Sequence, residues 1–218
     1  MFFENKPTRI EENDEYVQMM HQYIQDKYNV NFDIKESILP EEGFNTGMKE
    51  NILVVTDENG VSANVKAYLS TPYEYSDDYV YSLAADKIQK SLDLTDIEKH
   101  GCCKVYTVTN SSDPTDIDIS ADNIASLTFV AVIDHSSDDD ALDILYDVYS
   151  QIQTLGYADV YFLVAFSSDL EYFSKVVLNY TVYGQTSWSD YPAEISAYMN
   201  VMDNDLSKDA FTKELHAL

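Results

Sequence analysis

The stretch "LTFVAVIDHSSDDDALDILYDVYSQIQTLGYADVYFLVAF", residues 127–166, decides the fold of the second half of the chain. It opens and closes on apolar runs, 127–133 and 158–166, which are typical of buried strands. Between these runs, apolar residues recur every three or four positions from Ala141 to Leu155, which predicts a helix that ends before Gly156. A strand, a helix and a strand joined by short links predict a right-handed β-α-β crossover with parallel strands.

The rest of the second half adds elements to the same sheet. The sequence predicts a strand over 103–109, a helix over 169–182, an edge strand over 193–202 and a short helix from about 207. We therefore expect a mixed sheet that contains the β-α-β unit and carries helices.

The first half follows a different order, α-β-β-β-α. A helix over 14–28 places its apolar residues at three- and four-residue steps, and a half-buried strand follows over 31–38. Two strand-like runs flank "DENG", 57–60, where Asn59-Gly60 favours a positive φ and therefore a β-hairpin. A second helix is predicted over 77–92. This half is expected to be a small unit with an antiparallel hairpin.

Both halves mix helices with sheet, so the predicted fold class is α+β. Residues 1–12 are polar and lack periodicity, and we expect a flexible leader there. One α+β subdomain is predicted over 13–93 and a second, with the β-α-β crossover, over 102–218. The stretch 93–101 is the expected boundary between them.

The charge of the chain restricts its partners. Thirteen basic and 39 acidic residues give a formal charge of −26, and residues 101–218 contain four lysines and no arginine. Nucleic acids and anionic membranes bind through basic residues, so we expect neither as a partner. No apolar run approaches the roughly 20 residues that cross a bilayer, so no transmembrane segment is expected. This charge favours solubility, cation binding or long-range attraction of a basic partner, and it is also typical of a surface that is only solvated.

Acids and serines after the first buried run offer two interpretations. Asp134, Ser136 and Asp138 form a D-x-S-x-D pattern, which resembles the start of the metal-ion-dependent adhesion site of von Willebrand A domains and implies a divalent cation held by oxygen ligands. In that site the third position is a serine, whereas this chain has Asp138. Similar Ser/Asp groups precede two other predicted helices, at 75–79 and 167–171, which favours helix capping at all three places. Of these, Ser168 and Glu171 form a predicted capping box.

A second acidic stretch invites a calcium interpretation. Counted from Asp116, an EF-hand would need glycine and glutamate where the chain has Ala121 and Leu127, so an EF-hand is excluded. An irregular calcium loop and a solvated turn both remain open for the alternating acids of this stretch: Asp113, Asp116, Asp118 and Asp122.

No residue pattern predicts catalysis. The adjacent Cys102 and Cys103 would point to opposite faces of a strand, so two free thiols are expected, one buried and one exposed. No two of the four histidines stand three or four residues apart, and no glycine-rich phosphate motif is present. We expect no cofactor and no enzymatic activity.

Aromatic residues provide a candidate contact surface. The chain has 18 tyrosines and one tryptophan, and Tyr183, Trp188 and Tyr191 fall in one predicted loop. Such side chains are enriched at recognition surfaces, although many of the other tyrosines lie at core spacing.

The stretch "YIQDKYNVNFDI", 23–34, resembles small secreted or lipid-anchored proteins of unknown function from Gram-positive bacteria. The resemblance rests on Lys27 and Tyr28 at a helix end and on Phe32 in the next strand. It implies a location outside the membrane after removal of an N-terminal signal, and it implies no catalytic residues. Because residues 1–14 lack the apolar core of a signal, a cytoplasmic protein is the alternative.

Three functions follow from these patterns. The first is a non-enzymatic, secreted or cell-surface protein that binds another macromolecule. The second is a cytosolic acidic inhibitor, such as an immunity-type protein that masks a basic partner. The third is a divalent-cation-dependent enzyme or adhesion module built on Asp134.

Overall fold

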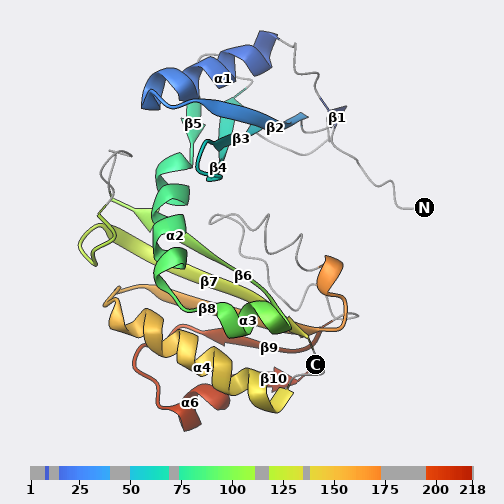
Figure 1. Cartoon of the computed structure of the whole chain (residues 1–218), viewed down its shortest axis with the longest axis vertical. Coiled ribbons are helices and arrows are strands. Elements are labelled where there is room, and N and C mark those ends of the chain that lie inside the picture. The colour runs from blue at the N-terminus through green and yellow to red at the C-terminus, as the bar shows by residue number, and fades with distance from the viewer. Residues whose placement is uncertain are drawn as a thin grey trace. The chain divides into compact units, whose positions relative to one another are not determined.

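The computed structural model describes residues 8–9, 15–39, 50–68, 74–110, 118–134, 138–172 and 195–217 (Figure 1). Contacts divide the chain into two compact units, with the division between Leu83 and Ala84. Each unit has a five-stranded sheet and at least one helix, which confirms the α+β fold class. None of the described helices is long and apolar enough to cross a membrane.

The first unit is an antiparallel sheet of order β1-β2-β3-β4-β5 with helix α1 packed on it. The buried stripe of α1 consists of the four residues predicted from the spacing: Val17, Met20, Ile24 and Tyr28. The elements of this unit are β1 (Thr8–Arg9), α1 (Glu15–Tyr28), β2 (Phe32–Leu39), β3 (Glu50–Asp57), β4 (Ser62–Tyr68) and β5 (Tyr75–Asp77).

Strands β3 and β4 form the predicted hairpin. Its turn has Gly60 at φ +86°, and the Asp57 side chain accepts hydrogen bonds from the backbone N–H of Asn59 at 2.9 Å and of Val61 at 2.8 Å. The inward face of β4 alternates as predicted, with Val61, Ala63, Val65 and Ala67 all buried. Leu69, which alternation places on the same face as these four residues, lies outside the described residues.

The edges of this sheet were not predicted. Within the expected leader 1–12, Thr8 and Arg9 pair with Leu39 and Ile38 of β2. Strand β5 occupies the start of the predicted helix 77–92, so that helix, α2, runs only over Tyr79–Ser91. A two- or three-residue strand is too short to show alternation in the sequence.

The expected boundary 93–101 forms part of the second unit. It contains helix α3 (Thr95–His100), and both Ile97 of this helix and the preceding Leu94 are buried. The N–H of Asp93 donates to Gln151 of helix α4 (Asp138–Thr154) at 2.8 Å. The division between units falls earlier, inside α2. The boundary prediction was wrong because a short helix with a polar surface has a composition similar to that of a linker.

The second unit is a mixed sheet of order β10-β9-β8-β7-β6. Strands β7 and β8 are parallel in continuous register from Leu127↔Val160 to Asp134↔Ser167, and α4 connects them, which confirms the β-α-β unit. Helix α4 is followed by Gly156 at φ +74°. The elements are β6 (Gly101–Thr109), β7 (Ile124–Asp134), α4 (Asp138–Thr154), β8 (Val160–Ser167), β9 (Ile195–Val201), α6 (Lys208–Thr212) and β10 (Leu215–Ala217).

Strand β9 is not the edge strand that the sequence predicted. It pairs with β8 on one side and with β10 on the other. The chain returns after α6 and adds the three-residue strand β10, which is again too short to be recognised from alternation. Residues 170–172 are helical and Asp169 precedes the helix, whereas residues 173–182 of the predicted helix 169–182 lie outside the described residues.

An aromatic cluster fills the core beneath α4. The rings of Phe129 and Phe162 stack at 4.7 Å, and Phe211 of α6 packs against Tyr149 at 4.9 Å and Phe162 at 5.7 Å. The Tyr149 hydroxyl donates to the backbone carbonyl of Asp203 at 2.8 Å, which fixes the segment between β9 and α6 onto α4. Apolar packing therefore carries this unit, and its buried hydroxyl bonds to backbone.

Candidate functional site

The acids that begin the predicted cation site lie between β7 and α4. Asp134 is the last residue of β7 and is partly buried, and α4 begins at Asp138. Ser136 and the side chain of Asp138 lie outside the described residues, so neither capping nor cation binding is decided at this place. Over the described part of the chain, no group of three or more His, Cys, Asp or Glu residues is arranged to hold a metal ion.

The two other Ser/Asp groups do cap helices, through aspartates. Asp77 accepts from the N–H of Tyr79 at the start of α2 at 3.2 Å. Asp169 accepts from the N–H of Tyr172 at 3.1 Å, so the predicted capping box of Ser168 and Glu171 was wrong about which residue caps.

The other predicted sites have mixed outcomes. Asp118 accepts from the N–H of Ser120 at 2.9 Å in an exposed turn, while Asp113 and Asp116 lie outside the described residues. The aromatic loop of Tyr183, Trp188 and Tyr191 also lies outside the described residues.

Both cysteines are free and both are partly buried, so the expected contrast between a buried and an exposed thiol was wrong. Burial raises the pKa of Cys102, and burial together with the nearby Glu98 raises that of Cys103 to about 12. A thiol reacts as its thiolate, so both are poor nucleophiles at neutral pH. The preceding Gly101 has a packing role, because a Cβ there would lie 1.9 Å from the backbone oxygen of Val132.

The most concentrated set of buried polar contacts lies in the first unit, and the sequence did not predict it. Asp77 has a completely buried side chain. One of its oxygens accepts from the Tyr28 hydroxyl at 2.6 Å, and the other accepts from the Tyr23 hydroxyl at 2.9 Å and from Lys27 Nζ at 2.6 Å. Three side chains from the last two turns of α1 thus converge on one carboxylate at the end of β5.

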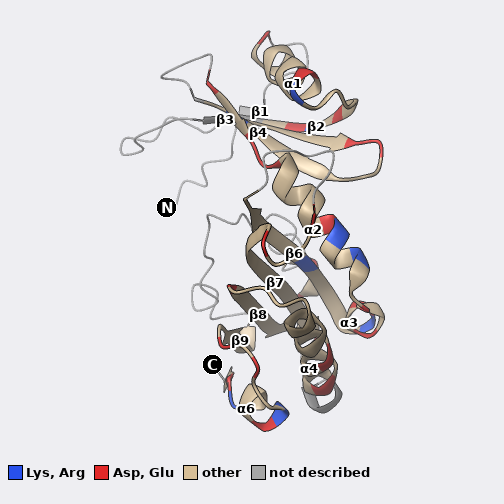
Figure 2. Ribbon diagram, turned by 90° about the vertical axis from the view of Figure 1, so that its left-hand side faces the viewer, with Lys and Arg blue, Asp and Glu red and all other residues tan. Residues whose placement is uncertain are grey.

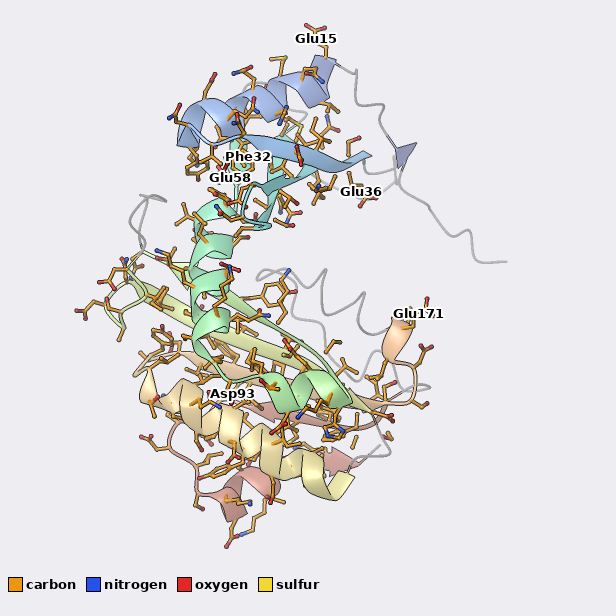
Figure 3. The ribbon with its side chains drawn as sticks, in the orientation of Figure 1. Glu15, Phe32, Glu36, Glu58, Asp93 and Glu171 are labelled. Carbon is orange, nitrogen blue, oxygen red and sulfur yellow. The ribbon has the colours of Figure 1, made fainter. Side chains whose placement is uncertain are left out.

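A second buried carboxylate lies close to the first. Asp57, already the acceptor within the β3–β4 turn, also accepts from the Tyr79 hydroxyl at 2.8 Å. The Tyr79 ring contacts Tyr28 at 5.0 Å and Phe32 at 4.9 Å. Figure 3 shows Phe32 at the start of β2 and Glu58 in the neighbouring turn, in agreement with the pairing of Phe32 and Asp57. We call this set the tyrosine–carboxylate network: Tyr23, Lys27, Tyr28, Asp57, Asp77 and Tyr79.

The network shifts the ionisation of its members. Burial, and then the hydrogen bond to Asp77, raise the pKa of Tyr28. Burial, and then the charge of Asp77, raise the pKa of Tyr23. Burial and the hydrogen bond to Asp57 raise the pKa of Tyr79. Burial alone would lower the pKa of Lys27, but the hydrogen bond to Asp77 reverses that effect and raises it. All three tyrosines are therefore neutral donors, and Lys27 is a cation that also lies 4.8 Å from the Tyr28 ring centroid.

One sequence signal pointed toward this network without being recognised. Tyr28 stands on the buried stripe of α1, and a buried tyrosine normally needs a partner for its hydroxyl. Lys27, Tyr28 and Phe32, the residues that carry the resemblance to secreted proteins, all lie in or against the network. The partner at residue 77 is separated from them by the whole hairpin, so the sequence alone did not identify it.

A separate acidic surface lies on the second unit. Exposed aspartates of α4 and of the segment that follows β9 lie close to Lys208 and Tyr149. The hydrogen bond to Asp143, with Asp147 nearby, raises the pKa of Lys208. Burial, with Asp205 and Asp203 nearby, raises the pKa of Tyr149. Figure 2 shows this acidic character along α4. Lys208 pairs with Asp143 at 2.8 Å. We call these residues the α4–α6 acidic surface: Asp143, Asp147, Asp203, Asp205 and Asp209.

Comparison with known proteins gives a likeness of fold. No family model and no curated protein matches the chain. Among solved structures, the chain is similar to a DUF5037 family protein from Ruminococcus gnavus ATCC 29149, with a TM-score of 0.50 at 12% sequence identity over 89% of this chain and 96% of that chain. At this identity the likeness supports the α+β fold alone and transfers no site residue.

Proposed function

We propose that this chain is a non-enzymatic binding protein, secreted or held at the cell surface, that contacts a basic macromolecular partner. The proposal rests on the formal charge of −26 and on the pairing of several lysines with acidic side chains. Ion pairs with acids already engage several of them: Lys27, Lys35, Lys90, Lys99 and Lys208.

The charge of the chain is therefore predominantly negative. Aspartates and glutamates outnumber basic residues threefold, and the α4–α6 acidic surface has a lysine that is already paired. A field of one sign raises the rate at which an oppositely charged partner associates and makes that rate depend on salt. Such a field is of little use toward nucleic acid or an anionic membrane.

The buried acids support a binding role over catalysis. Asp57 and Asp77 accept hydrogen bonds from backbone and tyrosine donors, and Asp78 accepts two from Asn64, at 2.6 Å from its N–H and 2.8 Å from its side-chain amide. These carboxylates hold elements together. Export is supported by the resemblance of 23–34 to secreted proteins.

The proposal is tested by capture from the native source at low and high salt, followed by binding kinetics with the captured protein. We expect a basic protein, whose association slows as salt rises. Asp143→Asn with Asp147→Asn should slow association further, and Asp26→Asn with Asp33→Asn, an equal change of charge in the first unit, serves as the matched control. A partner that is acidic, or whose association rate ignores both salt and charge, contradicts the proposal.

A cytosolic acidic inhibitor is the second candidate, and the same charge favours it. The two differ in location, so fractionation of the native cells with an antibody against the chain separates them. They also differ in consequence, because an immunity-type protein restores growth when its basic partner is produced in the same cytoplasm.

A further inference from the structure

Tyr79 is held by both buried carboxylates of the first unit. Its backbone N–H donates to Asp77 at 3.2 Å, and its hydroxyl donates to Asp57 at 2.8 Å. The residue is 3% exposed and lies at the first position of α2. A single residue thus links the acceptor of the β3–β4 turn to the acceptor that holds α1.

Each carboxylate also has other donors that belong to other elements. Asp57 orders its own turn through the N–H groups of Asn59 and Val61. Asp77 holds α1 through Tyr23, Lys27 and Tyr28. The network therefore joins three segments that are far apart in sequence: the C-terminal half of α1, the β3–β4 turn and the start of α2.

Opening one part of this network alone is unfavourable. A buried carboxylate that loses a donor is left with an unsatisfied oxygen away from water, which costs more than the loss of an exposed hydrogen bond. The Asp77 side chain is fully buried and Asp57 is 5% exposed. Release of one carboxylate to water would also break the ring contact between Tyr28 and Tyr79. The other carboxylate would then lose the packing that positions its tyrosine donor.

We propose that the tyrosine–carboxylate network is a conformational latch that makes α1, the β3–β4 turn and the start of α2 open and close as one. Coupling of this kind is reciprocal. A partner that holds the outer surface of α1 would stabilise the hairpin turn, and a partner on the turn would stabilise α1.

The test is native-state hydrogen exchange of single amides in the full chain. Two reporters are the Val61 N–H, which bonds to Asp57 at 2.8 Å, and the Asn29 N–H, which closes α1 onto Gln25 at 2.8 Å. Tyr79→Phe removes one hydroxyl and keeps the ring and the N–H. We expect both amides to exchange faster by a similar factor, on the order of tenfold, although Asn29 has no bond to the removed group.

A substitution of the carboxylate that holds α1 completes the test. Asp77→Asn should accelerate exchange at Val61, which Asp77 does not contact, as well as in α1. If the variant does not fold, Tyr28→Phe gives the same measurement with a smaller change. Acceleration confined to the turn in Tyr79→Phe and to α1 in Asp77→Asn or Tyr28→Phe would overturn the proposal.

Two controls separate coupling from general weakening. Asp33→Asn makes the same chemical change at an exposed ion pair with Lys35 in the same unit and should leave both amides unchanged. Tyr146→Phe removes a hydroxyl that donates to Leu206 in the second unit and should also leave them unchanged.

Discussion

The two units solve the same problem, fixing a helix onto a sheet, with different chemistry. In the first unit, α1 is held by Lys27 and two tyrosine hydroxyls on the buried Asp77. In the second unit, α4 lies over stacked phenylalanines, and its Tyr149 bonds to backbone near α6. The first arrangement adds charge and protonation to the apolar stripe of α1, whereas the second depends on shape and volume. Conditions and substitutions should therefore affect the two units differently.

The largest expected effect is on the apolar core. Phe162 is completely buried and contacts three other rings, so Phe162→Ala should lower the free energy of unfolding of the second unit by about 3–5 kcal/mol. Hydrogen exchange of β7 and β8 amides measures this loss. If α1 amides lose protection by the same amount, the two units unfold together and the comparison between them fails.

Alkaline pH should destabilise the first unit more than the second. Folding raises the pKa of Tyr23, Tyr28 and Tyr79 above the ordinary value of about 10, so their stabilising effect is complete below pH 10 and is lost as pH rises through that value toward the folded pKa. Exchange in α1 should therefore accelerate between about pH 10 and 12 more than intrinsic exchange predicts.

Tyrosines of the second unit provide the comparison for this titration. Burial raises the pKa of Tyr149 and raises that of Tyr157 to about 12. Neither donates to a carboxylate, because both bond to backbone carbonyls. We expect the second unit to lose less protection from exchange at alkaline pH than the first. Equal losses would show that carboxylate partners do not increase the sensitivity of the first unit to pH.

Removing the cation from the network should have a smaller effect. Lys27 is 40% exposed, so solvent screens its ion pair, and Asp77 keeps both tyrosine donors in Lys27→Met. We expect a loss of about 1 kcal/mol in the first unit, measured by urea unfolding. The exposed pair of Lys90 and Asp86 is the matched control, and Lys90→Met should cost no more than a few tenths of that amount. Equal losses of stability in the two variants would mean that burial of the aspartate does not strengthen its pairing with lysine.

Divalent cations should have the smallest effect. If Asp134 and Asp138 cap α4, millimolar Ca²⁺ or Mg²⁺ should leave the melting temperature nearly unchanged, whereas a bound ion at 100 times its dissociation constant would add about 2.7 kcal/mol. A rise of several degrees that disappears in the Asp134→Asn, Asp138→Asn double variant would establish a cation site and reverse our preference.

Periodicity predicted the elements that bury one clear face. The stripe of α1, the alternation of β4 and the apolar runs of β7 and β8 all lie where the spacing placed them. The strands that escaped prediction, β1, β5 and β10, are two or three residues long and are defined by pairing with distant strands. Sequence patterns report local preferences, and these strands have too few residues to express one.

The network escaped prediction for a related reason. Asp77 stands among serines and aspartates that suggested capping, and it does cap α2 through Tyr79. Its contacts with Tyr23, Lys27 and Tyr28 depend on how α1 packs against β5, which no local pattern describes. The aromatic spacing on α1 showed that a polar partner was needed, and the tertiary fold determined which residue supplied it.

Helix α2 has a practical consequence for anyone who wishes to study either half separately. The division between the compact units falls after Leu83, inside a helix that runs from Tyr79 to Ser91. A fragment cut there would keep little more than one helical turn, and so short a helix does not persist alone in water. Expression fragments of the N-terminal half should instead extend past Leu92, so that Tyr79 retains the rest of its helix.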